Sequence, residues 1–285
     1  MARRPGPHEA LTSPEGHTTV SVDTNPLIAV APEEIPLRNA PLVRVIAQVR
    51  FPVIASIDNR GFIASFQEAL RDAYPVLRPE MTQGFVVGSQ GITPAPSQMI
   101  WRFRDVQGEW RVSLAPDFIA LETTAYVSRS DFLARLHGAL RALHEHIGPK
   151  IIDRMGLRYI DRVLIHGVDD IATLVRREVI GILATPMAAS AHQALSESLF
   201  AVPNTHARLL ARWGQVPPHG TVDPSAIEPV DSPSWILDLD MFSADAQPFD
   251  PEALVAEVRT YAERIYTVFR WAVTEDFLRR YGGAL

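Results

Sequence analysis

Arginine and aspartate residues that alternate with apolar residues along extended segments are the side chains of this chain best suited to chemistry. Four such segments each contain a tryptophan, at Trp101, Trp110, Trp213 or Trp235. Successive side chains of a strand point to opposite faces, so each tryptophan shares the apolar face and the charged residues share the other. The charged positions are Arg102, Arg104, Arg111, Arg208, Arg212, Asp238 and Asp240.

A further predicted strand, at residues 156–165, places Arg158 and Arg162 on one face because they are four residues apart. Two interpretations of these charged faces stay open. The first is a solvated sheet face with cross-strand ion pairs, Arg208 or Arg212 against Asp238 or Asp240, each contributing about 0.2–1 kcal/mol. The second is a guanidinium-lined groove for a carboxylate, a phosphate or an acidic partner surface.

Asp161 lies between these two arginines and points to the opposite, apolar face of the strand. Burying an unpaired carboxylate costs several kcal/mol, so this side chain needs a partner. We expect Arg154 or Arg50 to supply one, in a structural ion pair rather than as part of a catalytic acid. Glu122, between Leu121 and Thr123, is likewise either one member of a structural ion pair or a catalytic acid.

The sequence contains no motif that predicts a catalytic centre, a metal site or a cofactor. It has no cysteine, which excludes disulfides, thiolate metal sites and a cysteine nucleophile. Lys150 is the single lysine, and neither a phosphate-binding P-loop nor a Gly-x-Gly-x-x-Gly dinucleotide motif is present. His137 and His144 are seven residues apart on one predicted helix face, a spacing that does not by itself bind a metal. Catalysis therefore has no positive support.

The charge composition limits the classes of partner. The 285 residues include 27 Lys+Arg and 33 Asp+Glu, a formal net charge of −6. Because 26 of the 27 basic residues are arginines that recur on strand faces, a locally basic surface is compatible with an acidic chain. The net charge argues against a general nucleic-acid binder, whose footprint is normally basic.

Hydrophobic periodicity predicts an α+β fold. Residues 42–149 are expected to follow the order β-α-β-β-β-α, and residues 150–285 the same order again. This order suggests a duplicated unit, with antiparallel sheets covered on one face by helices. The two halves could join edge to edge into one curved sheet with an open face, or pack as separate domains. Predicted helices include 62–73, 128–147, 171–182 and a long one from Pro251; residues 217–233 are predicted to be an exposed connector.

Residues 1–41 are predicted to be a flexible N-terminal arm. Residues 1–40 contain no aromatic residue, and seven of the 23 prolines fall at or before Pro41. Such a segment buries too little apolar surface to order itself, so it is disordered or loosely docked. The basic start lacks the apolar stretch of an export signal, and no run of about 18 apolar residues occurs. A cytoplasmic protein without membrane attachment is expected.

Several short segments carry a family resemblance: Val49-Arg50-Phe51-Pro52, Trp101-Arg102-Phe103, residues 121–126, 154–161 and 269–277. Together they resemble a sporadically distributed family of uncharacterised bacterial proteins, over roughly residues 42–280. That family has no assigned activity, so the resemblance implies kinship and supplies no catalytic residues. A patchy distribution implies an accessory gene, for example in a defence or toxin-linked locus.

The function predicted from these observations is that of a non-enzymatic binding protein. Its arginine-striped sheet face, or a groove between the halves, would engage a macromolecular partner, a protein rather than a nucleic acid. Tyr266, Phe269 and Trp271 are expected to pack in the core, and a homodimer through these residues is the alternative. The alternatives are a small anionic-ligand binder or hydrolase that uses Asp161, Asp238 or Asp240, and, third, a nucleic-acid binder.

Overall fold

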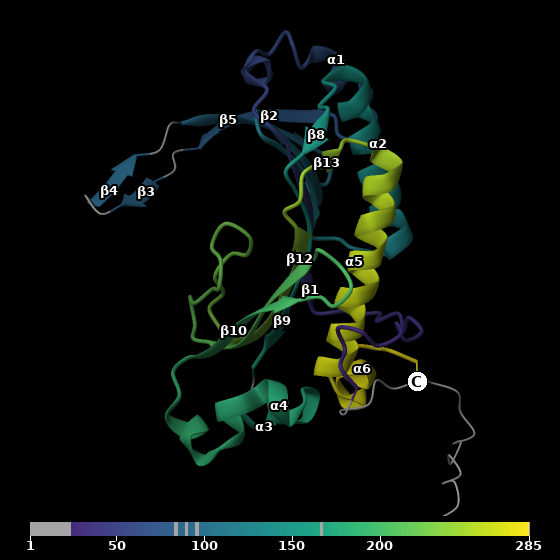
Figure 1. Cartoon of the computed structure of the whole chain (residues 1–285). Helices are drawn as coiled ribbons and strands as arrows, with labels where there is room; N and C mark the ends of the chain where they lie inside the picture. The colour runs from purple at the N-terminus through teal and green to yellow at the C-terminus, as the bar shows by residue number, and fades with distance from the viewer. Residues whose placement is uncertain (1–23, 83–84, 89–90, 95–96, 166–167, 285) are drawn as a thin grey trace, which may run out of the picture.

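The computed structural model describes residues 24–82, 85–88, 91–94, 97–165 and 168–284. Its centre is a nine-stranded sheet in which every neighbouring pair is antiparallel. Two long helices lie against one face of this sheet, and within the described residues the other face carries no long helix (Figure 1). The predicted α+β class with helices on one face of an antiparallel sheet is confirmed.

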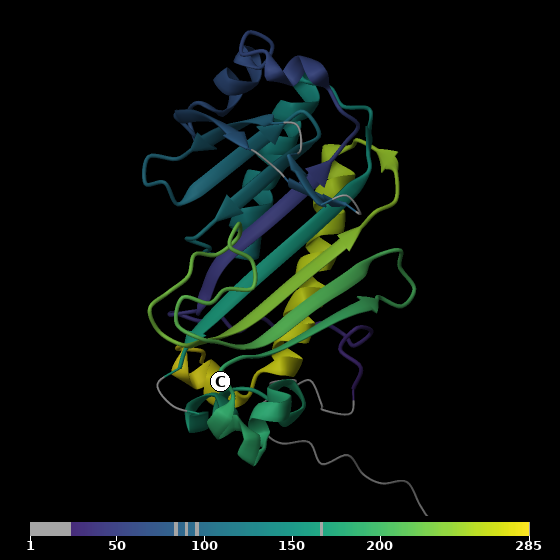
Figure 2. The ribbon, with the colours of Figure 1, turned by 90° about the vertical axis from the view of Figure 1, so that its left-hand side faces the viewer.

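The two halves of the chain join edge to edge through their first strands, β1 and β9, at the middle of the sheet (Figure 2). Within each half the last strand lies beside the first, and the earlier strands follow outward. The duplication itself stays a prediction. Across the sheet the strands are β10 (Ala194–Ala201), β11 (Arg208–Val216), β12 (Ser234–Ser243), β9 (Arg154–Leu164), β1 (Leu42–Arg50), β7 (Phe118–Thr123), β6 (Trp110–Ala115), β5 (Gln98–Arg104) and β2 (Val76–Thr82).

Two small ribbons accompany the sheet. One is the hairpin of β3 (Phe85–Gly88) and β4 (Gly91–Pro94), which projects from the β2–β5 edge on the side away from the helices (Figure 1). The other pairs β8 (Ile151–Ile152) with β13 (Gln247–Pro248).

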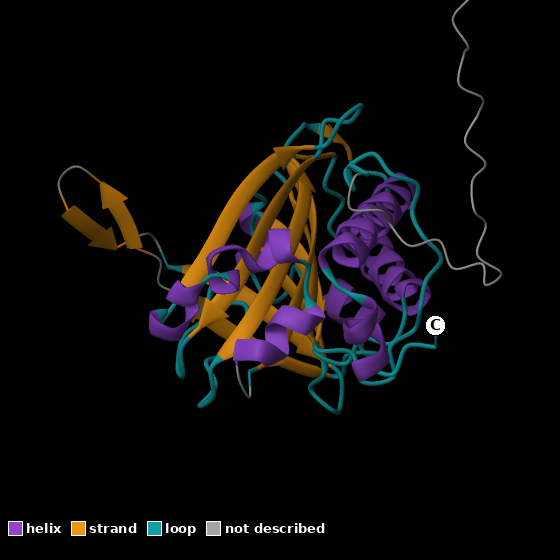
Figure 3. Cartoon of the chain, turned by 90° about the horizontal axis from the view of Figure 1, so that it is seen from below, coloured by secondary structure: helices purple, strands orange, loops and turns teal. Residues whose placement is uncertain are grey.

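The helices α2 (Arg129–His146) and α5 (Pro251–Ala272) form the second layer (Figure 3). Both begin at a side-chain cap: Ser128 Oγ accepts a hydrogen bond from the Asp131 amide at 3.2 Å, and Asp250 Oδ1 accepts one from Ala253 at 3.0 Å. Such caps satisfy amides that have no partner within the helix. The short helices are α1 (Ala64–Leu70), α3 (Val168–Leu174), α4 (Arg177–Ile180), α6 (Glu275–Arg280) and the 3-10 turns η1 (Ala55–Asp58), η2 (Gly181–Ala184) and η3 (Pro186–Ser190).

One hydrophobic core lies between the sheet and the helices and draws on both halves of the chain. Phe66 and Phe103 are fully buried within it, with ring centroids 5.5 Å apart in an edge-on arrangement. Burial of each such side chain contributes about 1.5–3 kcal/mol. Because one face of the sheet is buried in this core, alternate side chains of the strands point into it and the others point away from the helices.

The structure differs from the sequence-based expectation at three places described next. The helix expected over residues 171–182 breaks after Leu174, because Val175 forms a bridge with Val273 and the Arg176 amide donates to Ala272. Strand β2 was not predicted; it contains Pro79, which an edge strand tolerates. The connector 217–233 is only partly exposed, since Ala226 and Ile227 are buried against the sheet.

The described part of the N-terminal arm, residues 24–41, is docked on α5. Arg264 Nη1 donates to the carbonyls of Pro26 and Ala29 at 2.7 and 2.8 Å. The Ile35 amide donates to the Tyr266 hydroxyl at 2.8 Å. The flexibility predicted for residues 1–23 lies outside the described residues. Among the helices of the described ranges, none is both long enough and apolar enough to cross a membrane.

Candidate functional site

The sheet face opposite the long helices, which we call the open face, is turned toward the viewer in Figure 2. The strand register places most of the charged residues of the strands on this face. Residues directly opposite each other in neighbouring strands share a face, so the register assigns each side chain to a side. The open face receives five strand carboxylates, Glu80, Glu122, Glu197, Asp238 and Asp240. It also receives eleven arginines: Arg44, Arg50, Arg78, Arg102, Arg104, Arg111, Arg154, Arg158, Arg162, Arg208 and Arg212.

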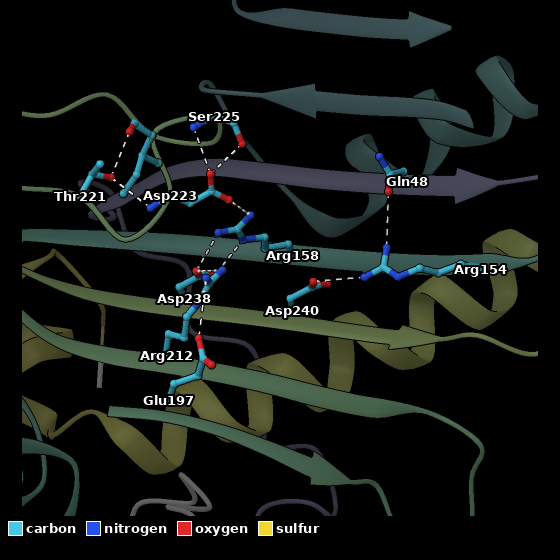
Figure 4. Close-up of polar contacts among 11 residues, drawn as sticks. Gln48, Arg154, Arg158, Glu197, Arg212, Thr221, Asp223, Ser225, Asp238 and Asp240 are labelled. Atoms are coloured by element: carbon cyan, nitrogen blue, oxygen red, sulfur yellow. Dashed lines mark hydrogen bonds and ion pairs between the residues drawn. The ribbon is translucent and has the colours of Figure 1, made fainter. Parts of the chain in front are cut away.

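Asp238 is the centre of the ion pairs in the second half of the sheet (Figure 4). Its side chain is 1% exposed, and Arg158 holds it through Nε and Nη2, each at 2.8 Å. From the neighbouring strand, Arg212 Nη2 lies 2.8 Å from Oδ2 of the same carboxylate. Two guanidinium groups therefore compensate one buried carboxylate, as a buried charge requires.

This ion pair extends into the connector 217–233 (Figure 4). Arg158 Nη1 donates to Asp223 Oδ2 at 2.8 Å, and Ser225 donates to Asp223 Oδ1 through both its amide and its hydroxyl. Burial alone would raise the pKa of Asp223, but the hydrogen bonds from Ser225 and Arg158 lower it to about 2. Ala226 and Ile227 of the connector pack on Ile160 and Ile236, so the connector covers this part of the open face.

Arg154 and Asp240 form a looser contact nearby. Arg154 Nη2 lies 3.3 Å from Asp240 Oδ2, and its guanidinium stacks 4.5 Å from the Phe242 ring centroid. Gly156 allows this arrangement, because a Cβ there would lie 3.0 Å from Arg154 Nη1. Burial raises the pKa of the Asp240 carboxyl, and the attraction of Arg154 offsets this only in part.

Glu122 occupies the corresponding central position in the first half of the sheet. Its side chain is 8% exposed; Arg44 Nη1 lies 2.6 Å from one carboxylate oxygen, and Arg111 Nε donates to the other. Arg102 Nη1 lies 3.9 Å from Glu122 Oε1 and donates a hydrogen bond to Ser113 Oγ at 2.7 Å. Burial alone would raise the pKa of Glu122, but the hydrogen bond from Arg111 and the charges of both arginines lower it.

The two halves place these groups at matching positions of the register. Glu122 lies opposite an isoleucine of β1 and opposite Arg111, while Asp238 lies opposite an isoleucine of β9 and opposite Arg212. The second arginine of each set, Arg44 or Arg158, precedes that isoleucine by two residues. An Arg–carboxylate–Arg arrangement thus occurs in both halves, which supports the proposed duplication.

The two halves differ in charge balance. We define the arginine cluster as the arginines around Glu122: Arg44, Arg78, Arg102, Arg104 and Arg111. Two carboxylates, Glu122 and Glu80, lie among them. The Glu80 carboxylate lies 3.1 Å from Arg102 and 3.5 Å from Arg104. Arg78 lies directly opposite Arg102, and Arg104 directly opposite Arg111. Like charges directly opposite each other are destabilising, so the fold alone does not favour this concentration of positive charge.

The nine residues predicted as site residues therefore separate into groups. Arg102, Arg104 and Arg111 lie in the arginine cluster. The ion pair predicted between Arg212 and Asp238 is present, with Arg158 as its third member, and Asp240 pairs with Arg154 instead. Of the other two, Arg162 donates to the Glu228 carbonyl at 2.7 Å, and Arg208 is exposed at the start of β11.

Sequence reasoning missed several participants. Arg44 alternates with Val43 and Val45 in the pattern that identified the other arginines, so that signal was present. Asp223 lies in a proline-rich connector with no periodicity, and no local signal places it beside Arg158. The partner expected for Asp161 was wrong: Arg154 and Arg50 both lie on the open face, whereas Asp161 faces the helices.

Groups of three or more His, Asp or Glu side chains that could hold a metal ion do not occur within the described ranges. No protein-family model matches the chain, and no curated protein matches it. The resemblance to a bacterial family consequently stays a prediction, and the functional argument rests on the geometry of the site.

Proposed function

We propose that this chain is a non-enzymatic binding protein whose arginine cluster engages an acidic segment of a partner protein. The observation that carries the proposal is the juxtaposition of Arg78 with Arg102 and of Arg104 with Arg111. Glu80 and Glu122 compensate part of this positive charge, and an anionic partner would compensate the rest. A cytoplasmic location and an accessory bacterial locus are further parts of the proposal.

The chemistry of the arginine cluster favours carboxylates as the bound groups. A guanidinium presents a planar fork of donors that matches a carboxylate in two parallel hydrogen bonds. Arg104 is 33% exposed at its side chain, and Arg78 is exposed. The cluster therefore has guanidinium surface in contact with solvent that an acidic segment can reach.

Two features argue for a protein partner over a nucleic acid. The carboxylates of Glu80 and Glu122 lie among the arginines and would repel a closely spaced row of phosphates. The formal charge of −6 also repels an extended polyanion outside the arginine cluster. A short acidic segment with spaced carboxylates is repelled less by Glu80 and Glu122 and less by the net charge of the chain.

Fluorescence anisotropy with the full chain tests which class of anion binds. The probes are a labelled polyglutamate peptide of about six residues, a labelled DNA duplex of about 20 base pairs and unlabelled citrate as a competitor. We expect saturable peptide binding that weakens with added salt and is tighter than DNA binding. Tighter DNA binding, displacement of the peptide by equimolar citrate, or no peptide binding at low salt would each overturn the proposal.

A further inference from the structure

A pocket on the opposite face of the sheet is independent of the arginine cluster. It has a volume of about 220 Å³ and lies where the docked arm, α5, the start of α2 and strands β9 and β12 meet. Pockets for drug-sized ligands usually measure about 300–1,000 Å³. A ligand that fits here has only a few heavy atoms.

Asp161 lines this pocket as a buried carboxylate without a partner. The residue is 7% exposed and projects from β9 toward the helices, and neither a hydrogen bond nor an ion pair from the described residues reaches its side chain. Burial alone raises its pKa to about 7. Buried carboxylates are normally paired, so this position lacks a cationic or hydrogen-bonding group.

The remaining walls are aromatic and apolar. Tyr126 and Tyr159 meet edge-on with ring centroids 5.5 Å apart, and the Tyr159 hydroxyl donates to the Tyr126 hydroxyl at 3.3 Å. Tyr266 and Phe269 stack on the α5 side, 6.1 Å apart. Aromatic faces attract cations, and walls of this kind are used to bind ammonium groups.

The charged residues at the pocket margin do not supply the missing cation. Arg129 pairs with Glu34 of the arm and lies 3.5 Å from Glu263. Its guanidinium is therefore compensated by two carboxylates at the margin of the pocket. Asp161 remains as the one carboxyl group without a partner among the described residues that line the pocket.

We propose that this pocket binds a small organic ammonium ion, with Asp161 as its counter-charge and the tyrosine rings as its walls. The bound cation would supply the partner that Asp161 lacks. This site does not depend on the proposed function of the arginine cluster, because the two lie on opposite faces of the sheet.

Nuclear magnetic resonance titration of the full chain tests the proposal, with the amides of Asp161 and Tyr126 as reporters. The probes are tetramethylammonium, n-butylammonium and choline, together with 3,3-dimethylbutan-1-ol, the neutral carbon analogue of choline. We expect saturable shifts with at least one ammonium ion and affinity for the neutral alcohol lower by about tenfold or more.

Two variants and one control locate the binding. Asp161→Asn keeps the shape of the side chain and removes its charge, and we expect it to weaken ammonium binding about tenfold or more. Ala262→Leu fills the pocket from α5 without changing charge and should abolish binding. Glu145→Gln removes an exposed carboxylate elsewhere, on α2, and should leave binding unchanged.

Binding of the neutral alcohol as tightly as choline would overturn the proposal, as would unchanged affinity in Asp161→Asn. Absence of a saturable shift with all three ammonium ions would also overturn it. None of these outcomes affects polyglutamate binding at the arginine cluster, so the two proposals fail separately.

Discussion

Arg158 donates two parallel hydrogen bonds of 2.8 Å to the carboxylate of Asp238, a side chain that is 1% exposed. This contact joins β9 to β12, and through the same guanidinium it reaches Asp223 in the connector. The second half of the open face is thus held together by its charges. In the first half six strand arginines share the open face with two strand carboxylates, against five arginines and three carboxylates in the second half, and we base the proposed binding role on this larger excess.

Removing the Asp238 carboxylate should destabilise the fold strongly. Asp238→Asn leaves the guanidinium groups of Arg158 and Arg212 without their shared counter-charge, and breaking a buried pair costs about 3–5 kcal/mol. Urea denaturation measures the free energy of unfolding. Asp240→Asn is the matched control, because its contact with Arg154 is longer, at 3.3 Å, and its loss should be much smaller. Equal losses in the two variants would contradict the central role of Asp238.

Acid should weaken the attachment of the connector. The pKa of Asp223 is lowered from 3.8 in the unfolded chain to about 2 in the folded chain, so its stabilisation is nearly complete above about pH 5 and decreases as the pH falls. As the pH falls from about 4 to about 2, up to about 2 kcal/mol is lost. Urea denaturation across this range should show a steeper decline for the wild type than for Asp223→Asn. Parallel profiles would show that Asp223 contributes nothing.

The contribution of Asp161 to stability should depend on pH in the opposite direction to that of Asp223. The pKa of Asp161 is raised from 3.8 to about 7 by burial, so between pH 4 and 7 the unfolded chain loses this proton while the folded chain keeps it. Stability contributed by this group therefore falls as the pH rises. The charged or titratable groups around the pocket are Tyr126, Tyr159, Tyr266, Arg129 and Glu34.

Those neighbours do not cancel the effect. Burial also raises the pKa values of Tyr126 and Tyr159, which keeps both neutral in this range, and Arg129 is paired with Glu34. Without ligand, the free energy of unfolding of Asp161→Asn should exceed that of the wild type by a few kcal/mol above pH 7, because each unit of pKa shift corresponds to about 1.4 kcal/mol. At pH 4 the two free energies of unfolding should differ little. Lower stability of Asp161→Asn at pH 8 would indicate a structural ion pair instead.

The docked arm should depend on the Tyr266 hydroxyl. This group accepts a hydrogen bond from the Ile35 amide at 2.8 Å and donates one to the Glu33 carbonyl at 3.2 Å. Tyr266→Phe removes both, together with a hydrogen bond from Arg270 Nη1 at 3.2 Å, and each such bond contributes about 0.5–1.5 kcal/mol. Hydrogen exchange of the Ile35 amide should accelerate, whereas that of Leu140 in α2 should not. Unchanged exchange at Ile35 would mean that other contacts hold the arm.

The sequence was sufficient to predict the faces of the strands and insufficient to predict contacts between distant segments. Alternation placed Arg102, Arg111 and Arg212 on a common side because the pleat has a period of two residues. The pairing of Arg158 with Asp223 depends on how a loop without periodicity folds over the sheet. Local patterns contain no information on that path.

For Asp161 too, the sequence predicted the face of the strand but not the contacts of the side chain. Its burial followed from strand alternation, but its partner was assigned to Arg154 or Arg50, which project from the other face. The rule that buried carboxylates are paired does not hold among the described residues here, because this carboxyl group lines a pocket whose other walls are mostly aromatic and apolar. Exceptions of this kind are expected at functional or strained sites.

The central claim is that the arginine cluster binds an acidic protein segment, and charge reversal tests it most directly. Arg78→Glu/Arg104→Glu reverses two charges in the cluster, and Arg141→Glu/Arg279→Glu reverses two exposed arginines on α2 and α6, so both variants have the same net charge. The quantity measured is the dissociation constant of the polyglutamate peptide at low salt. We predict a loss of about tenfold or more for the first variant and less than about threefold for the second. Equal losses in the two variants would contradict the account.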